Sequence, residues 1–382
     1  MLELERDGEP GGSQEDLGAL PQQDQRRMAQ VGVVVDKSEP RAGTFVQMDN
    51  EVKHYSARDK GLEVTGIRGA LRKYDRLKEY FWKAVPADKD EFTSHVAGQP
   101  ANGYFVRALP GAKVSYPVQA CLYLASRGLT QSVHNIVIAE EGSDLHLITG
   151  CTTSTARNSG VHLGVTEVYV KPGARVTSTM IHNWGPEVDV RPRTAVQIER
   201  GGVFVSNYVL LDIVRSVQMD PVAVCAGEDT TVYFNSVALA PPGAHLDLGG
   251  RVYLKARGAR AEIISRTAST GGTIIARGYI EGEVPDVRGH LECRGLLLAE
   301  GGNIHAIPEL KGDVPGLELS HEAAVGKIAD EEVEYLMARG ISRDEAVSMI
   351  VRGFLRVDIE GLPPSLAAEL QRAIQMADKQ SL

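Results

Sequence analysis

The stretch HNIVIAEEGSDLHLITG, residues 134–150, alternates apolar and polar residues, turns at a charged pair followed by Gly, and then alternates again. Alternation with a period of two is typical of a half-buried strand. The same form recurs four times further along the chain. The repeats are VTEVYVKPGARVTSTMI (165–181), AVQIERGGVFVSNYVLL (195–211), GGRVYLKARGARAEII (249–264) and GGTIIARGYIEGEV (271–284).

The corner glycines of this repeat predict a solenoid. Adjacent corners are roughly 20 to 30 residues apart, a period typical of repeat architectures in which each coil buries its face on the next. Helical patterns are almost absent here, which disfavours a βαβ sheet because parallel strands then need crossover helices. We therefore expect a parallel β-helix over residues 103–317, with a β-sandwich as the alternative. The predicted corners are at Gly142, Gly173, Gly202, Gly258, Gly278 and Gly301.

The composition agrees with stacked coils. The 382 residues include 40 Gly, but only 5% are aromatic. A thin interior filled by Val, Ile, Leu and Ala, with Gly at the corners, accounts for both values. A collagen-like chain is excluded because no G-X-Y period is present.

Charge and cysteine content limit the class of protein. A formal net charge of -9 argues against binding to nucleic acids or to anionic membranes. Apolar runs fall far short of the ~20 residues that span a bilayer. The polar N-terminus contains no apolar signal-peptide core, and the four cysteines form no C-x-x-C pair. We expect a cytoplasmic protein with free thiols.

The flanks differ from the repeat. Residues 1 to about 43 predict a mobile arm with one short helix at 22–31, and a helix is expected from Ile67 to Pro86. From Glu318 the pattern predicts a return to helix, with segments at 330–340, 342–354 and 365–377. Gly340 is expected after the first helix, and Ser342 with Glu345 is expected to cap the second. These helices would cap the solenoid, dock a partner, or do both. The predicted domains are 1–102, 103–317 and 318–382.

Common catalytic motifs are missing. The nearest approach to a phosphate-binding loop, residues 324–328, lacks the first Gly and the hydroxyl residue after Lys327. The chain also has no G-x-S-x-G elbow and no H-E-x-x-H zinc motif. No nucleotide hydrolysis is expected from this chain alone.

Four strings stand out in the chain: RAGTFVQMDNEVKH (41–54), VHNIVIAEEGSDLHLITGCT (133–152), STMIHNWG (178–185) and ELSHEAAVGKIADEEVEYLMARGISRDEA (318–346). Together they resemble the SufB/SufD family, the scaffold proteins of Suf-type iron–sulfur cluster assembly. The resemblance runs from about residue 24 to 375 and is closest to short SufB-like members. It implies a right-handed parallel β-helix with helical ends, and a dimer with a second SufB- or SufD-like protomer. It also implies docking of an ABC-type ATPase, SufC, so that the chain is a scaffold and not an enzyme.

The resemblance also implies site residues. Cys293 corresponds to the cysteine that binds the nascent iron–sulfur cluster, with His321 and Glu322 as candidate further ligands. Cys151 corresponds to the position that accepts sulfur, which a cysteine desulfurase would supply before the cluster passes to apo-proteins. A site with one Cys per chain is weaker than a Cys₄ site and easier to vacate, as a scaffold requires.

Other residues in the matching strings have more ordinary expectations. Arg294 stands where the family often has an acid, and His182 stands where it has Gln. The buried-hydrophobe interpretation is retained for every cysteine and preferred for Cys121 and Cys225. We expect Trp184 to pack and His134, His146 and His162 to be structural, while His290 and His305 are candidates for supporting the cluster ligands.

Two alternatives stay open at this point. The chain would otherwise be a SufD-like structural subunit, whose partner carries the essential thiol, or a carbohydrate-active β-helix enzyme. The resemblance does not specify the cluster type, the sulfur and iron donors, the acceptor proteins, the involvement of a flavin, or whether the dimer is homo- or heteromeric.

Overall fold

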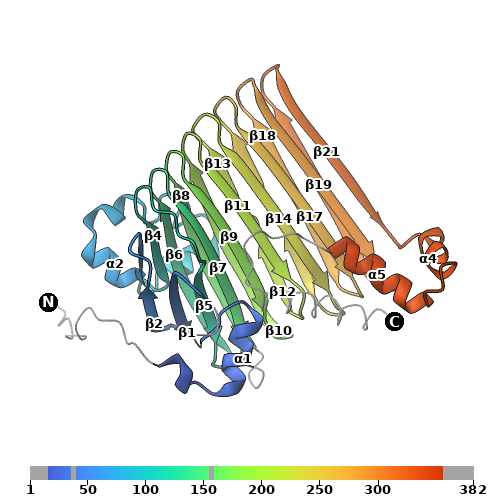
Figure 1. Cartoon of the computed structure of the whole chain (residues 1–382), viewed down its shortest axis with the longest axis horizontal. Helices are drawn as coiled ribbons and strands as arrows, with labels where there is room; N and C mark the ends of the chain where they lie inside the picture. Colours follow the sequence, from blue (N-terminus) through green and yellow to red (C-terminus); the bar gives the residue numbers. More distant parts are fainter. Residues whose placement is uncertain (1–15, 36–39, 155–158, 356–382) are drawn as a thin grey trace.

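The computed structural model describes residues 16–35, 40–154 and 159–355 and is mainly β (Figure 1). It forms a parallel β-solenoid of about 8 turns with helices at both ends, as predicted. After the first four strands the chain passes back and forth between two sheets, and the strands of each coil pair with their equivalents in the next coil. Within the described ranges, the only antiparallel pairs are β1 (Gly43–Met48) with β2 (Glu51–Ala57) and β3 (Leu62–Gly66) with β4 (Tyr104–Ala108), all at the N-terminal end.

Sheet A begins before the predicted core and ends after it. Two of its strands precede Gly103, and its last strand continues to Gly326. In spatial order it contains β2 (Glu51–Ala57), β1 (Gly43–Met48), β5 (Val118–Leu124), β7 (Asp144–Thr153), β9 (Arg175–Asn183), β11 (Val203–Leu210), β14 (Thr231–Ala240), β17 (Arg260–Ser269), β19 (Val287–Leu297) and β21 (Leu317–Gly326).

Sheet B forms the opposite wall of the solenoid. In two coils its strand is broken in the middle, so that two short strands replace one long strand. Its members are β3 (Leu62–Gly66), β4 (Tyr104–Ala108), β6 (Leu129–Ala139), β8 (Ser159–Val170), β10 (Glu187–Ile198), β12 (Ser216–Met219), β13 (Val222–Cys225), β15 (His245–Leu248), β16 (Arg251–Leu254), β18 (Thr273–Gly282) and β20 (Asn303–Gly312).

One row of corners is linked by backbone hydrogen bonds between successive coils. Gly142 has a φ of 66° and donates its N–H to the carbonyl of Pro172 at 2.9 Å. Gly173 has a φ of 63° and donates its N–H to the carbonyl of Arg200 at 2.9 Å. Glycine is favoured here because a left-handed backbone has no Cβ penalty in this residue.

The sequence located some of these corners wrongly. Gly278 lies inside β18, where an added Cβ would be 2.4 Å from Leu291, and the left-handed residue near 202 is Gly201. Asp229 and Asp286 form two of the corners with φ of 57° and 61°. A search for glycine misses them, although Asp tolerates the left-handed region better than most residues.

The N-terminal segment is packed, contrary to the prediction of a mobile arm for its described residues, 16–35. It contains η1 (Leu17–Ala19) and α1 (Gln22–Gln30), the short helix expected from the sequence. Met28, Val31 and Val33 are fully buried against sheet A. The prediction of a mobile arm rested on the polar composition of the segment. It is wrong because a few apolar residues are enough to hold the segment against sheet A.

The predicted helix from Ile67 to Pro86 is divided. It becomes α2 (Ile67–Lys73) and η2 (Asp75–Glu79), because Tyr74 between them is extended, with φ -119° and ψ 98°. With α3 (Glu91–Ala97), these elements belong to the N-terminal helical region. Their apolar side chains cover the outer face of sheet B.

The C-terminal helices α4 (Asp330–Met337) and α5 (Arg343–Leu355) form as predicted. The hydroxyl of Ser342 accepts the N–H of Glu345 at 3.3 Å, and Gly340 follows α4 with a φ of 85°. The predicted return to helix at Glu318 is wrong, because that segment is strand β21. The predicted helix at 365–377 lies outside the described residues, and the division into domains stays a prediction. No helix in the described part is long and apolar enough to cross a membrane.

Candidate functional site

Cys293 lies on β19, the second-last strand of sheet A. Inward-facing positions alternate along this strand, and Cys293 is among them with 1% of its surface exposed. Burial, aided by the negative charge of Glu292, raises the pKa of its thiol to about 11. The thiol is therefore protonated at neutral pH and needs a metal or a base to displace the proton.

The other two predicted ligands lie on β21, the last strand. His321 pairs with Leu291 and therefore faces the inner side. The residue opposite Cys293 is Ala323, two positions further along β21. Glu322 pairs with Glu292 and faces the outer side. Both predicted ligands are exposed, since β21 is the last strand of sheet A in the described part of the chain. The imidazole and the thiol thus share one face of the sheet, and the carboxylate lies on the other.

Arg294 connects the acids on the outer face. Its guanidinium lies 3.2 Å from Glu292 and 3.2 Å from Glu322. This cation, in a position where the family often has an acid, neutralises the carboxylate that was predicted as a ligand. Within the ranges described, no three His, Cys, Asp or Glu side chains cluster closely enough to hold a metal ion.

Cys151 is buried in the wall of the solenoid near its other end. It lies on β7, has 1% of its surface exposed, and pairs with Leu122 on one side and His182 on the other. Burial, with a smaller contribution from Cys121, raises the pKa of the Cys151 thiol well above its ordinary value. Cys121 and Cys225 are fully buried as well, as expected for core residues.

Buried rings surround the position opposite Cys151. His182 accepts or donates a hydrogen bond at Nδ1 with the Tyr208 hydroxyl, 3.1 Å away. Trp184 packs between His162 and His182, with ring centroids 5.1 and 5.6 Å apart, which confirms that it packs. Burial lowers the pKa of His162 to about 4 and that of His182 well below its ordinary value. These histidines are therefore neutral.

The two candidate working thiols are far apart. The residues paired across sheet A connect Cys151 through five strand pairs to Gly295, which is two residues from Cys293. Because paired residues face the same side of a sheet, both thiols face the inside of the solenoid. At about 4.8 Å per strand, the separation is about 25 Å, which excludes direct contact. The connecting pairs are Cys151–His182, His182–Leu210, Leu210–Ala238, Ala238–Thr267 and Thr267–Gly295.

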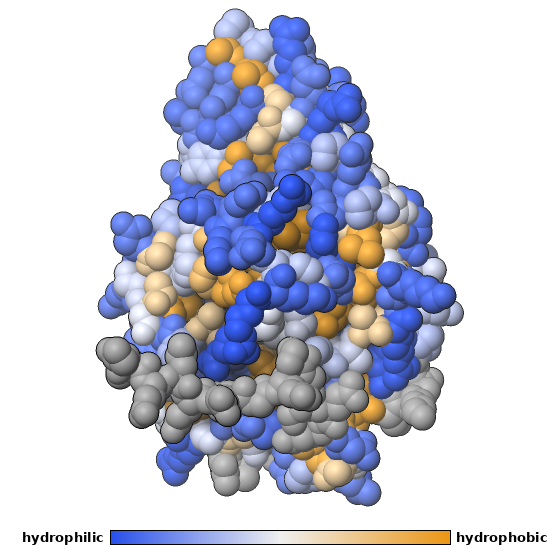
Figure 2. All heavy atoms as spheres, turned by 90° about the vertical axis from the view of Figure 1, so that its left-hand side faces the viewer, coloured by the Kyte–Doolittle hydropathy of each residue, from blue (hydrophilic) through white to orange (hydrophobic). Residues whose placement is uncertain are grey.

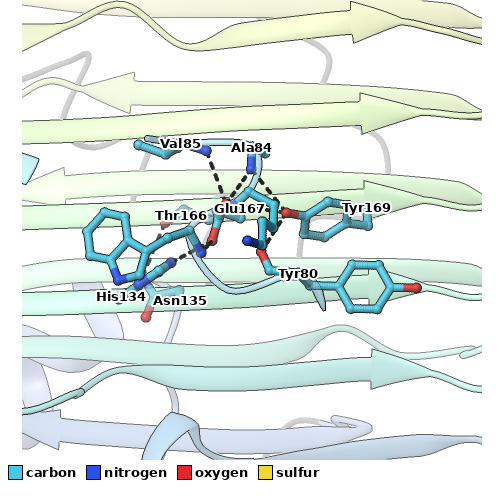
Figure 3. Close-up of polar contacts among 10 residues, drawn as sticks. Tyr80, Ala84, Val85, His134, Asn135, Thr166, Glu167 and Tyr169 are labelled. Carbon is cyan, nitrogen blue, oxygen red and sulfur yellow. Dashed lines mark hydrogen bonds and ion pairs between the residues drawn. The ribbon is translucent and has the colours of Figure 1, made fainter. Parts of the chain in front are cut away.

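A buried polar cluster that the sequence did not reveal joins the N-terminal region to sheet B (Figure 3). The Glu167 carboxylate accepts the backbone N–H groups of Trp82, Lys83, Ala84 and Val85 at 2.6 to 3.0 Å. The predicted structural histidine, His134, is part of this cluster. The nearest sequence signal was a charged residue between apolar neighbours in a strand. This pattern predicts a carboxylate on the outer side of the strand, but it does not predict which segment of the chain covers that carboxylate.

Comparisons with known proteins agree with this fold. The family profile described as "SUF system FeS cluster assembly, SufBD core domain" matches residues 120–354. An iron-sulfur cluster assembly SufBD family protein of Archaeoglobus fulgidus is 51% identical over 98% of this chain and 100% of its own length. A relative of the same description from Methanothermobacter thermautotrophicus strain Delta H is 47% identical over 94% of this chain and 89% of its own length. A third, from Pyrococcus horikoshii, is 32% identical over 95% and 82%.

Fold and comparisons together define a β-solenoid protein of iron–sulfur cluster assembly. The chain belongs to the SufBD family. This assignment confirms the resemblance seen in the sequence and favours cluster assembly over the carbohydrate-active alternative.

Proposed function

We propose that the chain is a SufB-like scaffold that assembles a nascent iron–sulfur cluster at a dimer interface and hands it to apo-proteins. Sulfur would come from a cysteine desulfurase through Cys151. A separate SufC-type ABC ATPase would drive the cycle, so the chain itself would be no enzyme. The working compartment would be the cytoplasm. The cluster is cargo here and not a resident cofactor.

The exposed last coil carries this proposal. Among the residues that the structure describes, strand β21 is the end of sheet A, and most of its side chains are exposed, including Val325 at 42%. An uncovered coil end leaves backbone groups and apolar side chains open to water, which favours association with a second strand. A second SufB- or SufD-like protomer seated there would cover His321 and bring its own donors close to Cys293.

The chemistry of the donors supports a site shared between protomers. One chain offers a single thiol and an imidazole on the inner face near the end of the solenoid. Iron–sulfur clusters are held by thiolates, and imidazole is a weaker substitute. Two half-sites related by two-fold symmetry would double the donor set without creating a permanent Cys₄ site.

Anaerobic reconstitution with ferrous iron and sulfide tests the proposal. The wild-type chain should gain a brown chromophore with charge-transfer absorption, and Cys293→Ala should lose it. Cys225→Ala is the matched control, because it removes a fully buried thiol that has no proposed role. Full cluster occupancy in Cys293→Ala would contradict the assignment. Loss in both variants would show that cavity formation, and not the ligand, is responsible.

We also propose that α4 and α5 dock the ATPase. Val351 and Leu355 of α5 are buried against the solenoid, whereas Tyr335 is 60% exposed and Met337 and Met349 more than 40%. Deleting the helices would uncover the apolar residues beneath α5, so surface changes make a better test. Tyr335→Glu with Met349→Glu should abolish co-purification with the ATPase while far-UV circular dichroism stays unchanged. Undiminished co-purification would refute the docking proposal.

A SufD-like structural role is the second candidate, and one contact favours it. Arg294 neutralises Glu322 in the chain, which removes one predicted ligand. Co-expression with the ATPase alone distinguishes the candidates. Competent cluster transfer from that pair supports the SufB-like role, whereas a requirement for another SufB-like chain supports the SufD-like role.

A further inference from the structure

Ser265 is an unusual residue for the inner face of β17. Inward positions alternate along this strand, and the first two, Ala261 and Ile263, belong to the apolar core. Ser265 is the next inward residue, and only 4% of its surface is exposed. Burial of a hydroxyl costs free energy unless the hydroxyl forms a hydrogen bond. A serine at this position therefore needs a hydrogen-bond partner.

The structure supplies no such partner. Within the described part of the chain, the Ser265 hydroxyl takes part in no hydrogen bond. The following inward residue, Thr267, differs, because its hydroxyl donates to the carbonyl of Arg294 at 3.4 Å. Ser265 thus keeps an unused donor inside the solenoid.

The neighbour of Ser265 on the next strand is Cys293. Ser265 pairs with Cys293 on β19, and Cys293 pairs in turn with Ala323 on β21. Paired residues face the same side of a sheet, and neighbouring strands lie about 4.8 Å apart. Rotation of the serine side chain between its staggered rotamers therefore brings the hydroxyl within reach of the sulfur.

Among the described residues paired with Cys293, Ser265 alone has a side-chain donor. Ala323, on the other side, has none. Glu292 and Arg294 flank Cys293 along β19, but both face the outer side of the sheet. Figure 2 shows the N-terminal end of the solenoid, at the opposite end of sheet A, where the polar side chains are too far from Cys293 to contribute.

The state of the sulfur decides whether the hydrogen bond forms. The sulfur of a thiol is a weak acceptor, so the bond gains little while Cys293 is free. A thiolate bound to iron carries negative charge, and hydrogen bonds to charged groups are roughly twice as strong as bonds between neutral groups. The Ser265 donor therefore suits the cluster-bound form of Cys293 better than the free thiol.

We propose that Ser265 donates a hydrogen bond to the Cys293 sulfur when this cysteine binds iron. The inference rests on the proposed function, in which Cys293 is a thiolate ligand of the nascent cluster. Ser265 is a positioning residue and not a ligand. Because its hydrogen bond offsets negative charge on the sulfur, Ser265 stabilises the reduced cluster and raises the reduction potential.

Redox titration of the reconstituted protein tests the proposal. The wild-type chain and Ser265→Ala are loaded anaerobically with ferrous iron and sulfide, and the charge-transfer absorption is followed as the potential is lowered. Ser265→Ala should decrease the equilibrium constant for one-electron reduction roughly tenfold, which corresponds to a potential about 59 mV lower. An unchanged potential would overturn the proposal.

Ser236→Ala is the matched control. Ser236 pairs with Ser265 and lies one coil further from Cys293 in the same inward row. This variant should keep the wild-type potential. An equal decrease in Ser236→Ala and Ser265→Ala would contradict the proposal, because it would reflect the general polarity of the interior and not a direct hydrogen bond.

The unloaded chain gives a second readout. Because the Ser265 hydroxyl has no partner there, Ser265→Ala should unfold at a urea concentration no lower than the wild type. A lower midpoint would assign the hydroxyl a structural hydrogen bond and refute its proposed role.

Cys293→Ala separates this inference from the proposed function. If Cys293→Ala keeps the chromophore, the cluster site is refuted, and the role of Ser265 with it. If Cys293→Ala loses the chromophore while Ser265→Ala keeps the wild-type potential, only the role of Ser265 is refuted.

Discussion

Glu167 lies 2.7 Å from His134 Nε2, and both side chains are buried between sheet B and the N-terminal region. Burial alone would raise the pKa of Glu167, but the hydrogen bonds from His134 and the backbone amides outweigh it and lower the pKa. Burial lowers the pKa of His134 more than Glu167 raises it. The pair is therefore a carboxylate and a neutral imidazole that donates through Nε2.

We predict that Glu167→Gln destabilises the protein by about 3 kcal/mol, because an amide nitrogen then faces backbone N–H donors in a buried site. Urea unfolding measures the change. Glu199→Gln is the control, since Glu199 pairs with Lys171 at 2.8 Å but is 46% exposed. It should cost less than about 1 kcal/mol. Equal effects of the two substitutions would contradict the anchoring role of Glu167.

Stability should fall on acidification from pH 7 to pH 5. The pKa of His162 is about 4 in the fold and about 6.5 when unfolded, so the unfolded chain binds more protons in this window. This histidine alone lowers the free energy of unfolding by roughly 2 kcal/mol between the two pH values. His134 and His182 act in the same direction, because their pKa values are also lowered.

Denaturant unfolding at both pH values measures this dependence. His162→Gln should flatten it, although the variant is itself less stable. Replacement of the exposed His245 by Gln should leave the dependence unchanged. An unchanged pH slope in His162→Gln would refute the assignment.

Thiol labelling should be slow in the native chain. All four cysteines are buried, and burial raises the pKa of each thiol. Less than one thiol per chain should react rapidly with a disulfide reagent at pH 7.5, and all four should react in denaturant. Rapid labelling of Cys293 in the native chain would show that the end of the solenoid opens more readily than its packing indicates.

Gly150→Ala should loosen the N-terminal segment. An added Cβ would lie 2.5 Å from the carbonyl oxygen of Val31, so the segment after α1 must move away from β7. We expect faster hydrogen exchange over residues 22–33 and a loss of about 2 kcal/mol. Gly326→Ala is the control, since nothing lies within 4 Å of its added Cβ. Unchanged exchange in Gly150→Ala would contradict the close packing.

Much of the architecture was readable from local patterns. Period-two alternation, Gly-containing corners and the scarcity of aromatic residues predict stacked coils, since each coil must bury one face on the next. The α4 and α5 helices were equally readable from their spacing and caps. The predicted corner at Gly278 and the predicted helix from Glu318 are wrong, because neither a Gly nor an apolar period shows whether a neighbouring coil packs against the segment.

The candidate site depended on tertiary structure. The sequence named Cys151, Cys293, His321 and Glu322, but strand register decides that the thiols lie about 25 Å apart and that Glu322 faces away from Cys293. The cluster around Glu167 was also invisible in the sequence. It combines segments tens of residues apart, and only the folded coils specify which residues meet.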